Sequence, residues 1–125
     1  MVGDIIVNKK KIKGSVMTSI FTKIINRELP SKIFYETDNI IVIEDINPKT
    51  NIHLLVIPKA ETKNFYSTPT ETLNLLNDTV KEIARMLKLE HRFRIQINNG
   101  FGQEVEHLHY HFMSDYKSDN LKFLN

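Results

Sequence analysis

The segment from 105 to 113 alternates histidines with large apolar residues, and this alternation is the strongest constraint on the fold. The histidines are His107, His109 and His111, and the residues between and after them are Leu108, Tyr110 and Phe112. Successive side chains of a β-strand point to opposite faces, so we predict a strand over 105–113 with three imidazoles on one face. The apolar residues then face a core. The chain therefore needs a sheet with one packed face and one face that holds a chemical site.

The rest of the chain predicts the partners of this strand. Alternating or apolar runs bounded by turn residues indicate strands at 32–37, 40–45, 52–57 and 92–98. Ser19 is a good N-cap for a short helix that stops before Pro30. A second helix should run from Pro69 to Leu89, with Thr68 as its N-cap and Glu71 completing a capping box. Its apolar stripe has a 3.6-residue period and consists of Leu73, Leu76, Val80, Ile83, Ala84 and Leu87. Short hairpins interrupted by helices predict an α+β fold with a five-stranded, mostly antiparallel sheet.

Length and composition limit the class of protein. The chain has 125 residues, of which 41% are hydrophobic and 26% charged, as expected for one domain with an ordinary core. No apolar stretch approaches the ~20 residues that a transmembrane helix needs, so we expect no membrane partner. Cysteine is absent, which excludes disulfides, thiolate metal sites and a cysteine nucleophile, and is compatible with a cytoplasmic protein.

The net charge of +2 is concentrated at the N-terminus. Residues 1–16 hold four lysines against Asp4, a net charge of +3, so residues 17–125 have a net charge of −1. We interpret 1–16 as a basic, disordered extension, 17–115 as the domain and 116–125 as a C-terminal tail. A nucleic-acid-binding arm is the alternative interpretation of the extension, but the charge of the domain itself gives no reason to expect a nucleic-acid partner.

Several sites could use three imidazoles on one strand face. A solvated polar face and histidines buried without a function are the simplest interpretations. A zinc site is chemically reasonable, but the three residues span about 13 Å, and no Asp or Cys stands at an obvious complementary spacing. A phosphate or phosphoryl-transfer site fits better, since a neutral imidazole can attack phosphorus while its neighbours donate to the oxygens.

The residues just before the histidines favour the phosphoryl-transfer interpretation. The segment 98–103 holds two glycines, which allow the backbone to approach an anion closely, and Asn98 and Gln103 offer neutral hydrogen-bond donors. A simple hairpin loop is the alternative. His53 lies in the middle of the predicted strand 52–57, where it could join the same cluster or be satisfied locally.

At this point the sequence resembles a known family. The segment from Gly102 to Met113 looks like the signature of the histidine triad (HIT) superfamily, in which three histidines alternate with apolar residues. Residues 19–25 resemble the family's opening helix, and 45–48 and 53–59 resemble its central hairpin. The resemblance covers about residues 19–115 and is greatest to the Hint branch and its bacterial relatives.

The resemblance implies a HIT fold and a nucleotidyl hydrolase or transferase that cleaves purine nucleoside phosphoramidates at the α-phosphorus, with no cofactor and no metal. His109 matches the nucleophile that forms a nucleotidyl-histidine intermediate, and His111 the histidine that contacts phosphate and leaving group. His107 matches the histidine that orients the cluster, and His53 the fourth histidine. Asn98 and Gln103 match side chains near the phosphate, and Asp45 the acid that binds the ribose hydroxyls. The apolar slot for the purine is matched by Ile20, Phe21, Ile24, Ile43 and Ile46.

The resemblance also implies a homodimer, in which Leu75, Met86 and the strand 92–98 meet a second copy. Glu104 departs from the Hint pattern, which usually carries a small hydroxyl residue there, and a carboxylate would repel a phosphate unless it points away or pairs with a base. The loop 98–103 is shorter than in animal Hint proteins, and their tryptophan-bearing C-terminal end has no match. Dinucleoside polyphosphate hydrolysis, as in the Fhit branch, and a nucleotide-binding adaptor with vestigial catalysis remain alternatives, as does a metal-binding module.

Overall fold

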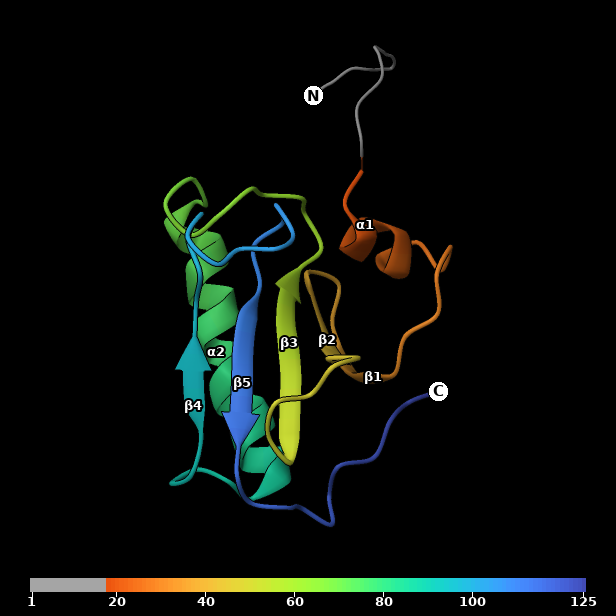
Figure 1. Ribbon diagram of the computed structural model, residues 1–125, viewed down its shortest axis with the longest axis vertical. Coiled ribbons are helices and arrows are strands. Elements are labelled where there is room, and N and C mark those ends of the chain that lie inside the picture. The colour runs from red at the N-terminus through yellow and green to blue at the C-terminus, as the bar shows by residue number, and fades with distance from the viewer. Residues whose placement is uncertain (1–17) are drawn as a thin grey trace.

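The computed structural model describes residues 18–125 as one five-stranded antiparallel sheet with two helices (Figure 1). The helices are α1 (Ile20–Ile25) and α2 (Thr70–Leu87), and the strands are β1 (Ile33–Glu36), β2 (Ile40–Glu44), β3 (Ile52–Pro58), β4 (Arg94–Gln96) and β5 (Tyr110–Ser114). The strand order is β1-β2-β3-β5-β4. The predicted α+β fold is confirmed. The predicted extension 1–16 lies outside the described residues, and no helix in the part that is described is long and apolar enough to cross a membrane.

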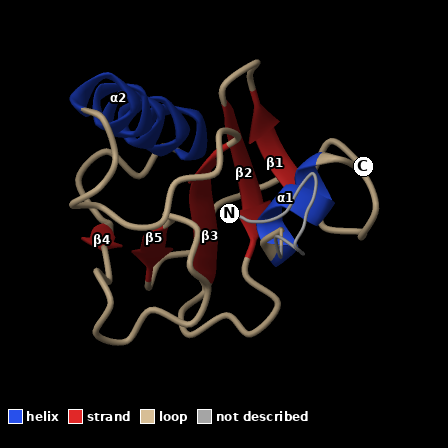
Figure 2. Ribbon diagram, turned by 90° about the horizontal axis from the view of Figure 1, so that it is seen from above, coloured by secondary structure: helices blue, strands red, loops and turns tan. Residues whose placement is uncertain are grey.

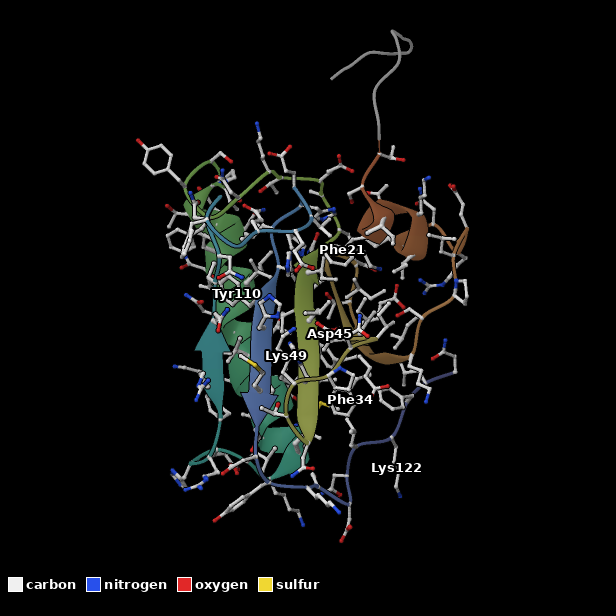
Figure 3. The ribbon with its side chains drawn as sticks, in the orientation of Figure 1. Phe21, Phe34, Asp45, Lys49, Tyr110 and Lys122 are labelled. Atoms are coloured by element: carbon white, nitrogen blue, oxygen red, sulfur yellow. The ribbon has the colours of Figure 1, made fainter. Side chains whose placement is uncertain are left out.

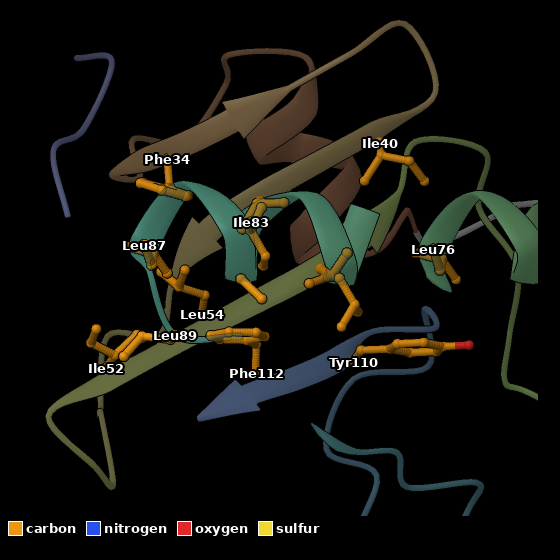
Figure 4. Packing of buried hydrophobic residues seen from close by; sticks show 14 of the residues in the cluster. Phe34, Ile40, Ile52, Leu54, Leu76, Ile83, Leu87, Leu89, Tyr110 and Phe112 are labelled. Atoms are coloured by element: carbon orange, nitrogen blue, oxygen red, sulfur yellow. The ribbon is translucent and has the colours of Figure 1, made fainter. Parts of the chain in front are cut away.

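The main core lies between the sheet and α2, which covers one face (Figure 2). Leu76 and Ile83 of α2 are completely buried against Leu54 of β3 and Phe112 of β5 (Figure 4). The predicted stripe of α2 is confirmed, because Leu76, Val80, Ile83, Ala84 and Leu87 are all buried and Leu73 packs at the margin. The apolar residues that recur with helical period in α2 and those that alternate in the strands thus pack into the same core, as the sequence predicts.

The opposite face of the sheet carries a smaller apolar cluster and the histidines. Phe21 and Ile24 of α1 pack there against Ile43 of β2 and Leu55 of β3. Leu55 alternates with His53 on β3 and stands opposite His111 on β5. The histidines therefore share their face with α1, and α2 stays on the other side (Figure 2).

The last strand is shorter than the predicted 105–113. β5 begins only at Tyr110, because the backbone N–H of Leu108 donates to the carbonyl of Thr62 at 2.7 Å instead of joining the ladder. Residues 107–109 are nevertheless buried, and Leu108 faces the core as predicted. Only His111 of the three histidines lies within the paired strand.

The predicted N-cap of α2 is wrong. The helix begins after Pro69, whose ψ of 146° marks the boundary, and no side chain caps it. The Thr68 hydroxyl instead donates to the carbonyl of Asn64 at 2.6 Å and contacts the hydroxyl of Thr62. Thr68 thereby closes the turn before the helix, and the capping box with Glu71 does not form.

The C-terminal segment 116–125 follows a defined course across the domain. Leu121 and Phe123 pack against the main core, and the N–H of Leu124 donates to the carbonyl of Ile33 at 2.7 Å. The Asn125 amide accepts from the Ile33 N–H and donates to the carbonyl of Ser31. The segment therefore starts below β5 and ends beside β1 (Figure 1).

Candidate active site

Two adjacent strands bring His53 and His111 together. Leu55 of β3 is paired with His111 of β5, and His53 lies two residues earlier on the same face of β3. The His53 Nε2 and His111 Nδ1 atoms are 2.9 Å apart, which is a hydrogen bond. The structure thus places His53 beside His111, in the histidine cluster.

A backbone donor determines which nitrogen of each ring carries the proton. The N–H of Lys49 donates to Nδ1 of His53 at 3.1 Å, so Nδ1 is the acceptor and Nε2 carries the hydrogen. His53 Nε2–H then donates to Nδ1 of His111, which leaves Nε2 of His111 as an N–H donor. The chain of hydrogen bonds thus runs from the turn before β3 to the strand β5.

Burial keeps these two rings neutral. It lowers the pKa of His111 to about 4, with the neighbouring His109 and His53 adding to the shift and Asp45 opposing it. Burial also lowers the pKa of His53, again against the attraction of Asp45. At neutral pH the pair therefore consists of two uncharged imidazoles, as the hydrogen bonds require.

His109 is oriented by its own strand. Its Nδ1–H donates to the carbonyl of His107 at 2.8 Å, so its Nε2 keeps a free lone pair. The ring is 8% exposed and packs edge-on against Phe21 and His111, with centroid distances of 5.0 Å to each. This is the arrangement that a nucleophilic imidazole needs: the ring is fixed in orientation, and Nε2 has no hydrogen-bond partner among residues 18–125.

His107 is completely buried and has both nitrogens occupied. Its Nε2–H donates to the carbonyl of Pro58 at 2.8 Å, and its Nδ1 accepts from the hydroxyl of Ser19 at 2.5 Å. Burial lowers its pKa, so it is neutral as well. His107 therefore connects β3 to the N-terminus of α1 and has no nitrogen left for a substrate.

Ser19, Thr22 and Glu61 extend this connection, and the sequence offered no signal for it. The Ser19 hydroxyl also accepts from the N–H of Thr22 as the N-cap of α1. Glu61 accepts from the N–H of Ser19 and from the hydroxyl of Thr22. A single polar network thus attaches α1, with Phe21 on it, beside the histidines.

A cavity of about 440 Å³ opens over these side chains. It contains five of the predicted site residues, namely Asp45, His53, Asn98, His109 and His111. Its lining also includes residues that the sequence interpretation did not assign to the site, above all Lys49, Gln96, Phe101 and Glu104. Figure 3 shows Asp45 and Lys49 along β3 and Phe21 nearer to α1.

Gln103 is predicted near the phosphate, but the structure places its amide within the loop. The amide nitrogen donates to the carbonyls of Lys63 and Val105, and the amide oxygen accepts from the N–H of Gly100. These three bonds hold a loop in which Gly100 and Gly102 both have φ of +77°. Gln103 therefore shapes the rim, and it is absent from the lining of the cavity.

The five predicted base contacts fall into two groups. Phe21, Ile24 and Ile43 are buried together in the smaller apolar cluster. Ile20 and Ile46 lie outside it, with exposed fractions of 48% and 87%. The structure thus brings three of the five together beside the histidines, and none of the five lines the cavity.

Asp45, His53 and His111 form the one cluster of potential metal ligands found among residues 18–125, with their ligand atoms within 4.8 Å of one another. The spacing of the sequence indicates no acid beside the histidines, but the fold brings one there: Asp45 Oδ2 lies 3.4 Å from His53 Nε2. A metal at that nitrogen would need its lone pair, but the N–H of Lys49 already occupies the only lone pair of neutral His53. Metal binding there would cost the Lys49 hydrogen bond.

With this geometry in place, comparisons with known proteins decide the family. Residues 26–118 match the HIT domain. The chain belongs to the HIT family. A HIT-like protein of Methanocaldococcus jannaschii, MJ0866, is 38% identical over 80% of this chain and 81% of its own length.

Solved structures agree with this assignment. A HIT family hydrolase from Clostridium thermocellum has a TM-score of 0.74 and 37% identity, covering 80% of this chain and 92% of its own. A histidine triad nucleotide-binding protein from Candida albicans has a TM-score of 0.73 and 31% identity, covering 86% and 80%. The HIT fold is thus supported by sequence and by backbone geometry together.

Proposed function

We propose that this HIT protein is a nucleotidyl hydrolase or transferase that cleaves purine nucleoside phosphoramidates at the α-phosphorus. The observation that carries the proposal is the hydrogen bond from His109 Nδ1–H to the carbonyl of His107, which frees Nε2 as a nucleophile. His111 stands beside it, with Nε2–H available to donate to a phosphoryl oxygen.

The reaction proceeds in two displacements. The lone pair of His109 Nε2 forms a bond to phosphorus, while the P–N bond breaks and its electron pair stays on the departing nitrogen, which takes up a proton from solvent. Water then attacks the nucleotidyl-imidazole and gives up a proton to solvent, the electron pair of the bond between phosphorus and His109 returns to Nε2, and a nucleoside monophosphate is released. His111 stabilises the charge on the phosphoryl oxygens in both steps through a hydrogen bond.

The surroundings supply a place for the nucleoside. Asp45, in the lining of the cavity, offers a carboxylate acceptor for the ribose hydroxyls. The apolar cluster of Phe21, Ile24 and Ile43, to which we assign the purine, lies beside the histidines but outside the lining of the cavity. The similar structures from Clostridium thermocellum and Candida albicans, which are named a hydrolase and a nucleotide-binding protein, support the same class of activity.

One assay separates this function from its alternatives. The protein is incubated with an adenosine 5′-phosphoramidate and with a diadenosine polyphosphate, with and without EDTA, and release of AMP is measured. We expect faster release from the phosphoramidate and no effect of EDTA. Faster cleavage of the polyphosphate would favour the Fhit-like activity, binding without turnover would favour an adaptor, and loss of activity restored by zinc would favour a metal-dependent protein.

We also propose that the protein is a homodimer. β4 is a three-residue edge strand, and Leu75 and Phe93 are large apolar residues with exposed fractions of 41% and 37%. An edge strand and exposed apolar side chains are stabilised by pairing with a second copy. Sedimentation equilibrium should give twice the chain mass of 14.6 kDa, whereas a mass near 14.6 kDa at micromolar concentration would exclude a stable dimer.

A further inference from the structure

Glu104 is a second carboxylate in the wall of the catalytic cavity. Both Asp45 and Glu104 line it, but their surroundings differ. Asp45 approaches His53 and accepts from the N–H of Asn47. The carboxylate of Glu104 is exposed and has neither an ion pair nor a hydrogen bond with any residue of the described segment 18–125. It is therefore available to a ligand.

The two carboxylates belong to opposite sides of the site. Asp45 follows β2, and Glu104 belongs to the loop that follows β4, together with Asn98. In the sheet order, β3 and β5 with the histidines lie between β2 and β4. If the ribose lies at Asp45 and phosphorus at His109, as in the proposed function, the leaving group extends toward Glu104.

We propose that Glu104 determines the specificity for the leaving group and selects phosphoramidates whose leaving amine carries an additional positive charge. The proposal rests on the proposed function and names its substrate class. In the P–N cleavage the electron pair and a proton go to the departing nitrogen, and Glu104 forms and breaks no covalent bond. Its carboxylate accepts hydrogen bonds from an ammonium group on the leaving amine.

The other charges near the site agree with a cationic leaving group. Lys49 belongs to the turn before β3, on the side of Asp45. Arg92 and Arg94 line a different cavity at the far end of β4, and Arg92 is paired with Asp115 at 2.8 Å. Near Glu104 the cavity is lined instead by Phe101, which is 95% exposed and offers an aromatic face to a cation.

The same position disfavours an anionic leaving group. A polyphosphate extending from phosphorus past Asn98 would bring its negative charges toward the Glu104 carboxylate, with no cation in the lining of that side. The exposed position reduces the effect through solvent screening, so we expect changes of severalfold rather than of orders of magnitude.

The test uses three adenosine substrates and the 125-residue chain. The leaving groups are an aminoalkyl amine with a terminal ammonium, an alkyl amine of equal length without it, and the ATP moiety of diadenosine tetraphosphate. We expect the wild-type kcat/KM to be about fivefold higher for the ammonium-bearing amine than for the neutral one. Glu104→Gln should abolish that ratio, and Glu104→Lys should invert it and raise the kcat/KM for diadenosine tetraphosphate.

Glu106→Gln is the matched control, because Glu106 lies in the same loop, does not line the cavity and is close to Lys63. It should leave all three rates unchanged. An equal change for all three substrates in Glu104→Gln, or an unchanged ratio, would overturn the role of Glu104 while leaving the proposed function intact. If the wild-type protein releases no AMP from any substrate, the proposed function fails, and this inference fails with it.

Discussion

The two faces of the sheet are built by different rules. On the face toward α2, apolar side chains such as Leu54, Phe112 and Ile83 pack against one another, and this packing depends on the shape and volume of the side chains. On the opposite face, His53, His107, His109 and His111 each need a particular polar partner. Apolar packing tolerates many arrangements, whereas each imidazole hydrogen bond fixes one ring orientation and one protonation state.

Along a single strand, residues that stabilise the fold therefore alternate with residues of the candidate active site. Phe112 and His111 are neighbours in β5, yet one is in the main core and the other in the cavity. Substitutions on the α2 face should therefore change the free energy of unfolding, and substitutions on the histidine face should change turnover.

The largest effect is expected for His109→Ala. Loss of the nucleophile removes the covalent pathway, so kcat should fall on the order of 10³-fold or more, while nucleotide affinity and the unfolding transition stay near the wild type. His91→Ala is the control, since His91 is exposed and does not line the cavity. A His109→Ala protein with even a tenth of the wild-type rate would show that another group is the nucleophile.

Phe112→Ala and His111→Ala compare the two faces directly. Phe112 is completely buried and stacks on Phe93 at 4.9 Å, so its truncation should cost about 3–5 kcal/mol of unfolding free energy. His111→Ala should cost only about 1 kcal/mol but should lower kcat strongly. Urea denaturation and steady-state kinetics on both variants measure this, and similar stability losses in the two would contradict the division between the faces.

Asp45→Asn tests whether Asp45, on the histidine face, binds the ribose hydroxyls. Removing the charged acceptor should weaken binding of ribonucleotides by about 1.5–3 kcal/mol. Binding of 2′,3′-dideoxy analogues, which lack the diol, should change little. Calorimetric titration with both ligands provides the comparison, and equal weakening of the two would make Asp45 a structural residue.

The smallest effect concerns pH. Burial lowers the pKa of His107, and that of His111 to about 4, whereas an unfolded chain binds these protons near pH 6.5. As the pH falls from about 6.5 to 4, the unfolded state gains protons first, so the free energy of unfolding decreases. His107→Gln should make this decrease shallower, and His91→Gln should not. An identical slope in wild-type and His107→Gln proteins would refute the contribution of the buried ring.

The face toward α2 was predictable because its signal is local. The 3.6-residue period of α2 and the alternation of Leu108, Tyr110 and Phe112 both place apolar residues on one side. Both predictions depend on a few neighbouring residues.

The histidine face was only partly predictable because its contacts are distant and partly made by the backbone. Ser19 and His107 are separated by 88 positions, and the partner of His53 is the N–H of Lys49, a group that every residue except proline possesses. Thr68 likewise matches a helix cap in sequence, but its hydroxyl has nearer partners in the folded turn. No pattern of residue types encodes these choices.

The stereochemical course at phosphorus tests the central claim, a covalent intermediate on His109, most directly. A phosphoramidate made chiral at phosphorus with sulfur is hydrolysed in isotopically labelled water, and the configuration of the product is determined. Two successive in-line displacements, first by His109 and then by water, each invert the centre, so the account predicts overall retention. Inversion would mean that water attacks phosphorus directly, and would contradict a nucleophilic role for His109.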